Sequence, residues 1–139
     1  MTIDGIDGVV KEGEVKERES LVVLVETSKV WGVEIVLAQG PSYCGKKLMI
    51  NDGGKSSLHF HRSTDETLYV QDGQLVVDVY PEGYDNGSGR RERYMLDTGK
   101  SIRIPPNIPH QFLAITKSEV FEFATQHSQD DIYRLENGT

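Results

Sequence analysis

Four side chains in the middle of the sequence have the types and spacing to hold a metal ion. His59 and His61 are two residues apart in a strand-like segment, so both side chains point to the same face of a sheet. Glu66 precedes the next apolar segment, and His110 follows the proline-rich turn at 105–109. Three imidazoles and a carboxylate suit one divalent transition ion (Mn, Fe, Co, Ni or Zn) better than Ca or Mg, which prefer oxygen ligands. We therefore predict a metal site with positions open for water or substrate.

The elements that must position these side chains are short strands. Segments rich in Val, Ile, Leu, Tyr and Phe alternate with turns that contain Gly and Pro, and no segment has a sustained helical apolar stripe. The predicted strands are LVVLVE (21–26), VEIVLA (33–38), KKLMI (46–50), SLHFH (57–61), TLYV (67–70), QLVVDVY (74–80), SIRI (101–104), HQFLAI (110–115) and VFEFAT (120–125), with a further strand leading to Gly99. Many short strands separated by turns predict an all-β sandwich or barrel.

The chain has the length of one domain. Its 139 residues can bury a core without disulfides or structural metals. We expect a polar N-terminal arm at 1–20, a single barrel at 21–135 and a C-terminal tail at 136–139. Segment 130–139 is predicted to be a short helix or coil.

Composition excludes several classes of partner. The net charge of −7 disfavours nucleic acid and anionic lipid. The longest aliphatic run, Leu21–Val25, is far shorter than the roughly 20 residues of a transmembrane helix. The N-terminus lacks the pattern of a secretory signal. Cys44 is the single cysteine, so no intrachain disulfide is possible, and we predict a cytoplasmic protein.

The candidate ligands lie within two motifs that resemble those of the cupin superfamily. The first motif is matched at every spacing by Gly53-x5-His59-x-His61-x4-Glu66-x6-Gly73. The second is approached by Gly99-x5-Pro105-x-Asn107-x2-His110, with Asn107 where the family usually has Gly and Ala114 where it usually has Asn. Asn tolerates positive φ, so we expect the turn to form. The resemblance implies a double-stranded β-helix (cupin, or jelly-roll) barrel with the metal in its mouth.

A finer resemblance points to sugars. Segments 29–37, 43–50, 57–73 and 121–135 are similar to parts of the cupin domain of type II mannose-6-phosphate isomerases. This implies an aldose–ketose isomerase of carbohydrate metabolism, in which a metal polarises a carbonyl and a base moves a proton between two carbons. Candidates for the base are Glu122, Lys47 and a metal-bound hydroxide. Glu122 could equally be an outward salt-bridge partner, and Lys47 an exposed strand residue.

Alternatives remain at this point. The same ligands would serve an iron-dependent dioxygenase, and a cupin that binds or senses sugars without catalysis is the third hypothesis. Arg90, Arg91 and Arg93, in the loop 81–94, would either grip a phosphate or offset nearby acids. His127 lies beyond the last clear strand, where a surface position is expected. Unpaired strand edges and the run Leu21–Val25 predict a homodimer.

Overall fold

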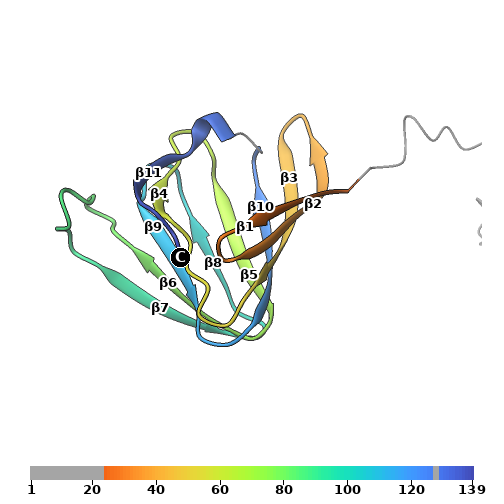
Figure 1. Cartoon of the computed structure of the whole chain (residues 1–139). Coiled ribbons are helices and arrows are strands. Elements are labelled where there is room, and N and C mark those ends of the chain that lie inside the picture. Colours follow the sequence, from red (N-terminus) through yellow and green to blue (C-terminus); the bar gives the residue numbers. More distant parts are fainter. Residues whose placement is uncertain (1–23, 127–128) are drawn as a thin grey trace, which may run out of the picture.

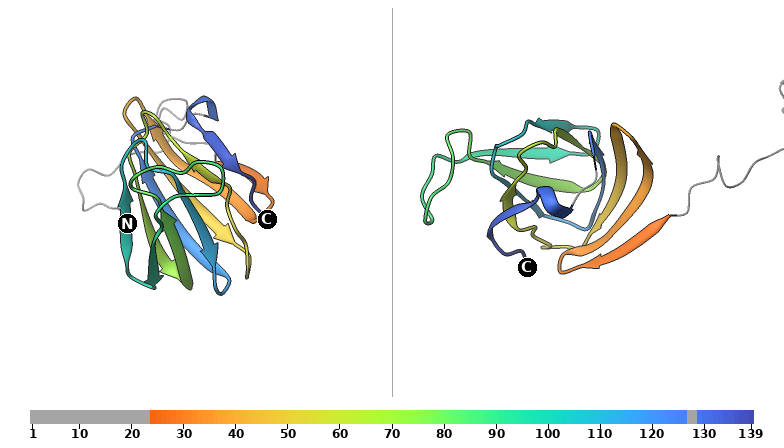
Figure 2. Two further views of the ribbon diagram at one scale, coloured as in Figure 1. Left: turned by 90° about the vertical axis from the view of Figure 1, so that its left-hand side faces the viewer. Right: turned by 90° about the horizontal axis from the view of Figure 1, so that it is seen from above.

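The computed structural model describes residues 24–126 and 129–139, whose strands form two antiparallel sheets that face one another (Figures 1 and 2). The six-stranded sheet has the order β1 (Val25–Lys29), β2 (Gly32–Gly40), β3 (Tyr43–Ile50), β10 (Ser118–Ala124), β5 (Glu66–Asp72) and β8 (Ser101–Ile104). The five-stranded sheet has the order β11 (Tyr133–Glu136), β4 (Leu58–Phe60), β9 (His110–Ala114), β6 (Gln74–Val79) and β7 (Glu92–Asp97). One 3-10 turn, η1 (Gln129–Asp131), precedes β11.

The core lies between the two sheets and follows from the alternation of side chains along each strand. In β3, Lys46, Leu48 and Ile50 are buried, while Lys47 and Met49 between them are partly exposed. Val70 of β5 and Val77 of β6 are fully buried and reach the same core from opposite sheets. Side chains at alternate positions of such strands point into the space between the sheets, so a polar residue at one of these positions also lies there.

The all-β prediction is confirmed, but the two sheets do not join into a closed barrel. β8 ends one sheet and β7 ends the other, and no ladder links them in the described part of the chain. Side chains such as Leu96 and Ile104 fill the space between the two strands instead of backbone hydrogen bonds. A groove of about 670 Å³ runs along this β7–β8 seam.

Several boundaries differ from those expected. The first described strand is β1, whereas residues 21–23 of the predicted strand and the arm at 1–20 lie outside the described residues. Segment 130–139, predicted to be helix or coil, contains part of η1 and the whole of β11, which pairs with β4. Beyond β11, the backbone of Thr139 exchanges two hydrogen bonds with Lys55, each 2.9 Å long.

Helical structure is slight in the described chain. Apart from η1, which has three residues, its elements are strands. None of its helices has the length and apolar character needed to cross a membrane.

Candidate metal centre

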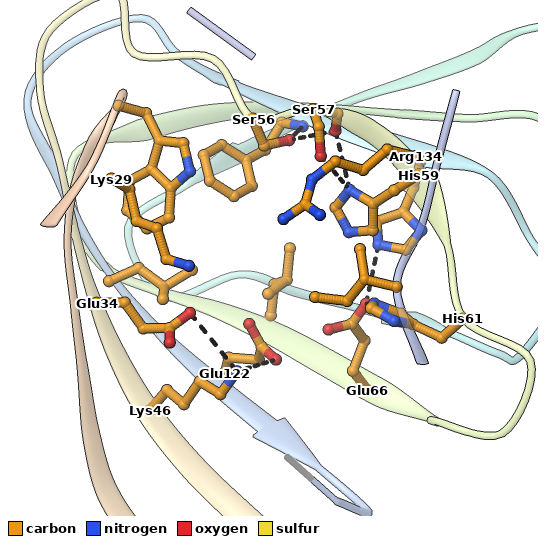
Figure 3. Close-up of a pocket in the computed structure, with 16 residues that line it drawn as sticks. Lys29, Glu34, Lys46, Ser56, Ser57, His59, His61, Glu66, Glu122 and Arg134 are labelled. Atoms are coloured by element: carbon orange, nitrogen blue, oxygen red, sulfur yellow. Dashed lines mark hydrogen bonds and ion pairs between the residues drawn. The ribbon is translucent and has the colours of Figure 1, made fainter. Parts of the chain in front are cut away.

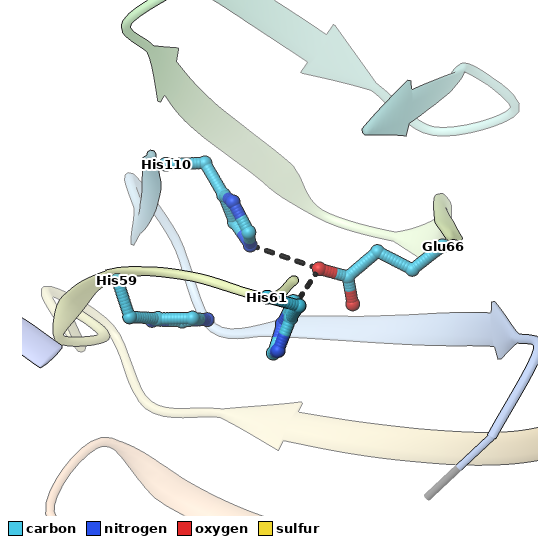
Figure 4. A group of neighbouring side chains, drawn as sticks. All are labelled: His59, His61, Glu66 and His110. Atoms are coloured by element: carbon cyan, nitrogen blue, oxygen red, sulfur yellow. Dashed lines mark ion pairs between the residues drawn. The ribbon is translucent and has the colours of Figure 1, made fainter. Parts of the chain in front are cut away.

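The structure brings the four predicted ligands together between the sheets (Figure 4). His59 on β4 lies directly opposite His110 on β9, and His61 follows the end of β4. Glu66 begins β5 and reaches the same point from the other sheet. One ligand atom from each residue lies within 4.8 Å of every other. The predicted grouping is therefore present, with ligands from both sheets.

The turn that precedes His110 is hydrogen-bonded to the chain at the end of β4. Asn107 has a φ of 70°, in the left-handed region that Asn tolerates better than most side chains. Its backbone N–H donates a 2.6 Å hydrogen bond to the carbonyl oxygen of His61. The turn forms with Asn107 where the family usually has Gly, as expected, and it links two of the segments that carry candidate ligands.

Asp131 of η1 fixes the loop between His61 and Glu66. Its carboxylate accepts hydrogen bonds from the backbone N–H groups of Arg62, Ser63 and Thr64, at distances of 2.9–3.3 Å, and from the Thr64 hydroxyl at 2.7 Å. Burial opposes its ionisation, but these donors outweigh it and lower the pKa of Asp131. The residue thus orders the loop that sets the spacing of two ligands.

Each imidazole is oriented by its second nitrogen. The Nδ1 atoms of His59, His61 and His110 lie 3.0, 2.9 and 2.8 Å from the backbone carbonyl oxygens of Ser57, Asp131 and Ile108. A carbonyl only accepts, so each Nδ1 carries the proton and donates it. The Nε2 lone pairs are then free to bind an ion, as in many metal sites with imidazole ligands.

The charges at the centre fit a cation. Burial, followed by the charges of His110 and His61, lowers the pKa of His59 to about 3, so this imidazole is neutral. Burial also opposes ionisation of Glu66, but the imidazoles of His110 and His61 lower its pKa well below the usual range. Glu66 Oε2 lies 3.1 Å from His61 Nε2 and 2.8 Å from His110 Nε2.

That oxygen supplies the test of fit for a metal. Glu66 Oε2 is buried and makes no hydrogen bond of acceptable geometry, although two Nε2 atoms surround it. A buried carboxylate oxygen without such a partner is costly. A divalent transition ion among the four ligand atoms would satisfy it, and the donor set of three nitrogens and one oxygen suits that ion.

The ligands form one side of a cavity of about 110 Å³ (Figure 3). On the other side, Lys46 Nζ lies 3.6 Å from Glu34 Oε1 and 3.9 Å from Glu122 Oε2. Burial and then the charge of Glu66 raise the pKa of Glu122 well above the usual range. The cavity therefore combines the candidate metal ligands with a second acid–base group, and Glu122, one of the candidate bases, lines it.

The structure does not bring Lys47 into the cavity. Side chains alternate along β3, and Lys46 shares its face with Leu48, so Lys47 points outward. Its amine lies 3.7 Å from Glu119 Oε2 on the neighbouring strand. The choice of Lys47 as a candidate base is corrected by this geometry, and Lys46 lines the cavity instead. The spacing of Lys46 to Leu48 and Ile50 was the signal that would have found it.

Arg90, Arg91 and Arg93 also lie away from the cavity. Arg90 pairs with Glu82 and Glu92, while Arg93 binds the carboxylate of Asp78 at 2.8 Å. Arg91 lies 4.0 Å from Asp78. The reading in which these arginines offset nearby acids is the one the structure shows. His127 lies outside the described residues.

Aromatic residues divide between the two faces as their alternation predicts. Phe112 is buried and packs edge-on against Trp31, with ring centroids 5.2 Å apart, and both line the cavity. Phe60, between His59 and His61 in sequence, points the other way and stacks on Tyr133. Cys44 is buried beside Val36 and Ala124, and burial raises the pKa of its thiol.

Two facing antiparallel sheets with a histidine–glutamate centre between them define a small jelly-roll protein with a candidate metal site. Residues 47–125 match the family model described as the Cupin domain. This match covers more than half of the chain, which therefore belongs to the cupin family. No curated protein matches the chain.

Solved structures share the fold at low sequence identity. The capsular polysaccharide assembling protein CapF from Staphylococcus aureus has a TM-score of 0.70 at 18% identity, over 82% of this chain and 34% of CapF. Oxalate decarboxylase from Bacillus subtilis has a TM-score of 0.67 at 16% identity, over 81% of this chain and 30% of the enzyme. KdgF from Halomonas sp. has a TM-score of 0.57 at 21% identity, over 70% of this chain and 81% of KdgF. The chain spans about a third of the length of the first two proteins.

Proposed function

We propose that the protein is a metal-dependent enzyme that interconverts an aldose and a ketose, acting on a sugar or sugar phosphate as cupin mannose-6-phosphate isomerases do. The observation that carries the proposal is the position of Glu122. Its carboxylate lies in the same cavity as His59, His61, Glu66 and His110, on the wall across from most of them. An isomerase needs both a Lewis acid and a base at one small site.

The residues have separate tasks in this reaction. When bound, a divalent ion would supply the Lewis acidity that polarises the substrate carbonyl. The ionised form of Glu122 accepts the proton from the neighbouring carbon and returns it to the former carbonyl carbon. The hydroxyl proton of that neighbouring carbon passes to the former carbonyl oxygen, so the reaction is balanced without an oxidant or reductant. Lys46, 3.9 Å from Glu122, orients the carboxylate and is itself held by Glu34 at 3.6 Å.

Part of the remaining wall of the cavity is apolar. Trp31, Leu48, Leu68 and Phe112 line it and belong to the buried core. Such a wall keeps bulk water from the reacting carbons and strengthens the electrostatic interactions of the polar groups. A small cavity of this kind suits the reacting end of a sugar.

Deuterium exchange tests the proposal directly. The metal-loaded protein is incubated in deuterated water with aldoses, ketoses and their phosphates, and products are followed by NMR. Deuterium at C1 or C2 of a converted sugar is the expected result. Glu122→Gln should reduce the rate by about 100-fold or more while retaining the metal, because it removes the proton acceptor.

The matched control is Glu119→Gln on the same strand. Its carboxylate faces outward and pairs with Lys47, so the exchange rate should be unchanged. Absence of exchange with every sugar would contradict the isomerase. Oxygen uptake by the iron-loaded protein would favour the dioxygenase, and sugar binding without turnover would favour a sugar-binding cupin.

A further inference from the structure

The cations at the mouth of the cavity differ from most others in the described chain because they have no acidic partner. Most lysines and arginines of the described chain are paired with carboxylates. They are Lys46, Lys47, Arg90, Arg91, Arg93, Lys100 and Arg103. Lys29 and Arg134 both line the cavity, and neither has an acidic group within ion-pair distance among the described residues. In a chain with a net charge of −7, two such cations at one opening need an explanation.

Strand register places Arg134 on the cavity side of its sheet. Arg134 of β11 lies directly opposite His59 of β4, and cross-strand partners project from the same face. The preceding residue, Tyr133, projects from the other face and stacks on Phe60. Figure 3 shows the guanidinium of Arg134 extending into the cavity near His59. The arginine therefore shares the cavity with the metal ligands while remaining exposed to solvent.

Lys29 reaches the same opening from the other sheet. It ends β1, next to the turn that contains Trp31. A second hollow, of about 490 Å³, adjoins the cavity and shares Lys29, Trp31, Ser57 and Arg134 with it. No acidic residue of the described part of the chain lines this outer hollow. A ligand that enters the cavity therefore passes between two cations that have no carboxylate partner among residues 24–126 and 129–139.

We propose that Lys29 and Arg134 form an anion-binding subsite at the mouth of the metal cavity. Its ligand is a small molecule that carries a phosphate or carboxylate at one end and reaches the metal centre with the other. Arginine presents paired N–H donors that match two oxygens of either group, and lysine adds a point charge. The subsite itself does not depend on the proposed function; only the identification of its ligand as the substrate rests on that proposal.

Anion binding to the metal-loaded full-length protein tests the subsite. Inorganic phosphate and acetate are titrated separately in a calorimeter at low ionic strength, which distinguishes a phosphate site from a carboxylate site. The Lys29→Gln/Arg134→Gln double variant should bind the preferred anion about tenfold or more weakly, as expected for lost charge-assisted hydrogen bonds. Metal content and thermal unfolding should match those of the unmodified protein.

The matched control is Arg91→Gln/Lys117→Gln. It removes the same two residue types and the same net charge, and neither residue lines the cavity or the outer hollow. Its anion affinity should be unchanged. Arg134→Lys keeps the charge and should restore much of the affinity lost in Arg134→Gln, which covers the case in which the double variant folds poorly.

Two results would overturn the inference. One is equal anion affinity in the double variant and the unmodified protein, and the other is no binding of either anion by the unmodified protein. Either result can be distinguished from failure of the proposed isomerase function. Anion binding through Lys29 and Arg134 without sugar turnover would refute the isomerase and support the subsite.

Discussion

The three histidines of the candidate metal centre are oriented by the ring nitrogens that face away from it. Each Nδ1 is held by a backbone carbonyl, so the ligand nitrogens are oriented by the fold before an ion arrives. Little side-chain freedom remains to be lost on binding, which favours tight coordination. The contribution of each ligand can therefore be measured by removing one ring at a time.

His61→Ala should abolish stoichiometric metal binding. It removes one of three nitrogens and leaves Glu66 Oε2, 3.1 Å from the deleted ring atom, with one fewer partner. The affinity should fall by at least about 100-fold, more than is usual for loss of a group that only supports a ligand. Metal content after dialysis is the measurement. Phe60→Leu, on the opposite face, is the control, and full occupancy in His61→Ala would refute the assignment.

Metal affinity should rise with pH across the neutral range. Burial opposes protonation of His61, but the carboxylate of Glu66, whose Oε2 lies 3.1 Å from Nε2, outweighs burial and raises the pKa of the imidazole in the metal-free protein. Ions must displace that proton, so below this pKa the affinity should fall by about tenfold per pH unit. Glu66 stays ionised in this range, since its own pKa is lowered. Competition titrations with a chelator from about pH 5.5 to about pH 8.5 would measure this change in metal affinity. A flat profile would exclude proton competition at His61.

At the scale of elements, the sequence shows where apolar strands lie but does not show exposed strands that are held by pairing with a neighbour. The strands around Leu48, Val70 and Val77 are predictable because their apolar residues are continuous or alternate. β11 is not, because all four of its residues are exposed and it is held through pairing with β4. Arg134 was consequently missed as a cavity residue.

The difference between Lys46 and Lys47 has a similar origin. The predicted strand 46–50 lies within β3. Which of the two lysines points inward depends on its position in the alternation of side chains along the strand and not on its residue type. Glu34 was missed for the same reason, since it shares its face with Val36 in β2. The four candidate metal ligands were predictable because the spacings within the two motifs fix both their strands and their faces.

Asp131→Asn tests the role of η1 in holding the ligand loop. The change removes the charge that accepts hydrogen bonds from the segment at 62–64, and it should lower the free energy of unfolding by about 1–3 kcal/mol. Urea denaturation at neutral pH is the measurement, with an unchanged m-value. Asp52→Asn, at an exposed turn, is the control. The deficit should shrink as pH falls below the usual carboxyl value of 3.8 toward the lowered pKa of Asp131, because the stabilisation is complete above the unfolded-state pKa and is lost as the carboxylate is protonated in the folded protein. Equal stability of the two variants would contradict this role.

At the scale of the whole molecule, the two sheets leave open edges. β7 and β8 flank the β7–β8 seam, where Tyr94 and Met95 are 43% and 49% exposed. At the far side of the six-stranded sheet, β1 has β2 as its one partner among the described strands, and Val25 is 55% exposed, next to Leu24 at 56%. Unpaired edges with apolar side chains favour association with a second sheet.

We expect a homodimer that uses the β1 edge. Light scattering at micromolar concentration should give twice the chain mass of 15.6 kDa. Leu24→Asp/Val25→Asp should shift the protein to the monomer, because charge at this edge opposes pairing. Tyr94→Asp/Met95→Asp at the β7–β8 seam is the control and should remain dimeric. A monomer mass for the unmodified protein would rule out the dimer.

The insertion of β10 between β3 and β5 also governs how the chain folds. Both neighbours precede β10 by many residues, so until it arrives the six-stranded sheet exists as separate halves with unpaired inner edges. Pairing over such separations is slow, and refolding in milliseconds to seconds is expected for a topology of this kind. During that interval β3 and β5 offer apolar edges to other copies of the chain. Refolding yield should therefore fall as protein concentration rises, even where the native protein stays in solution.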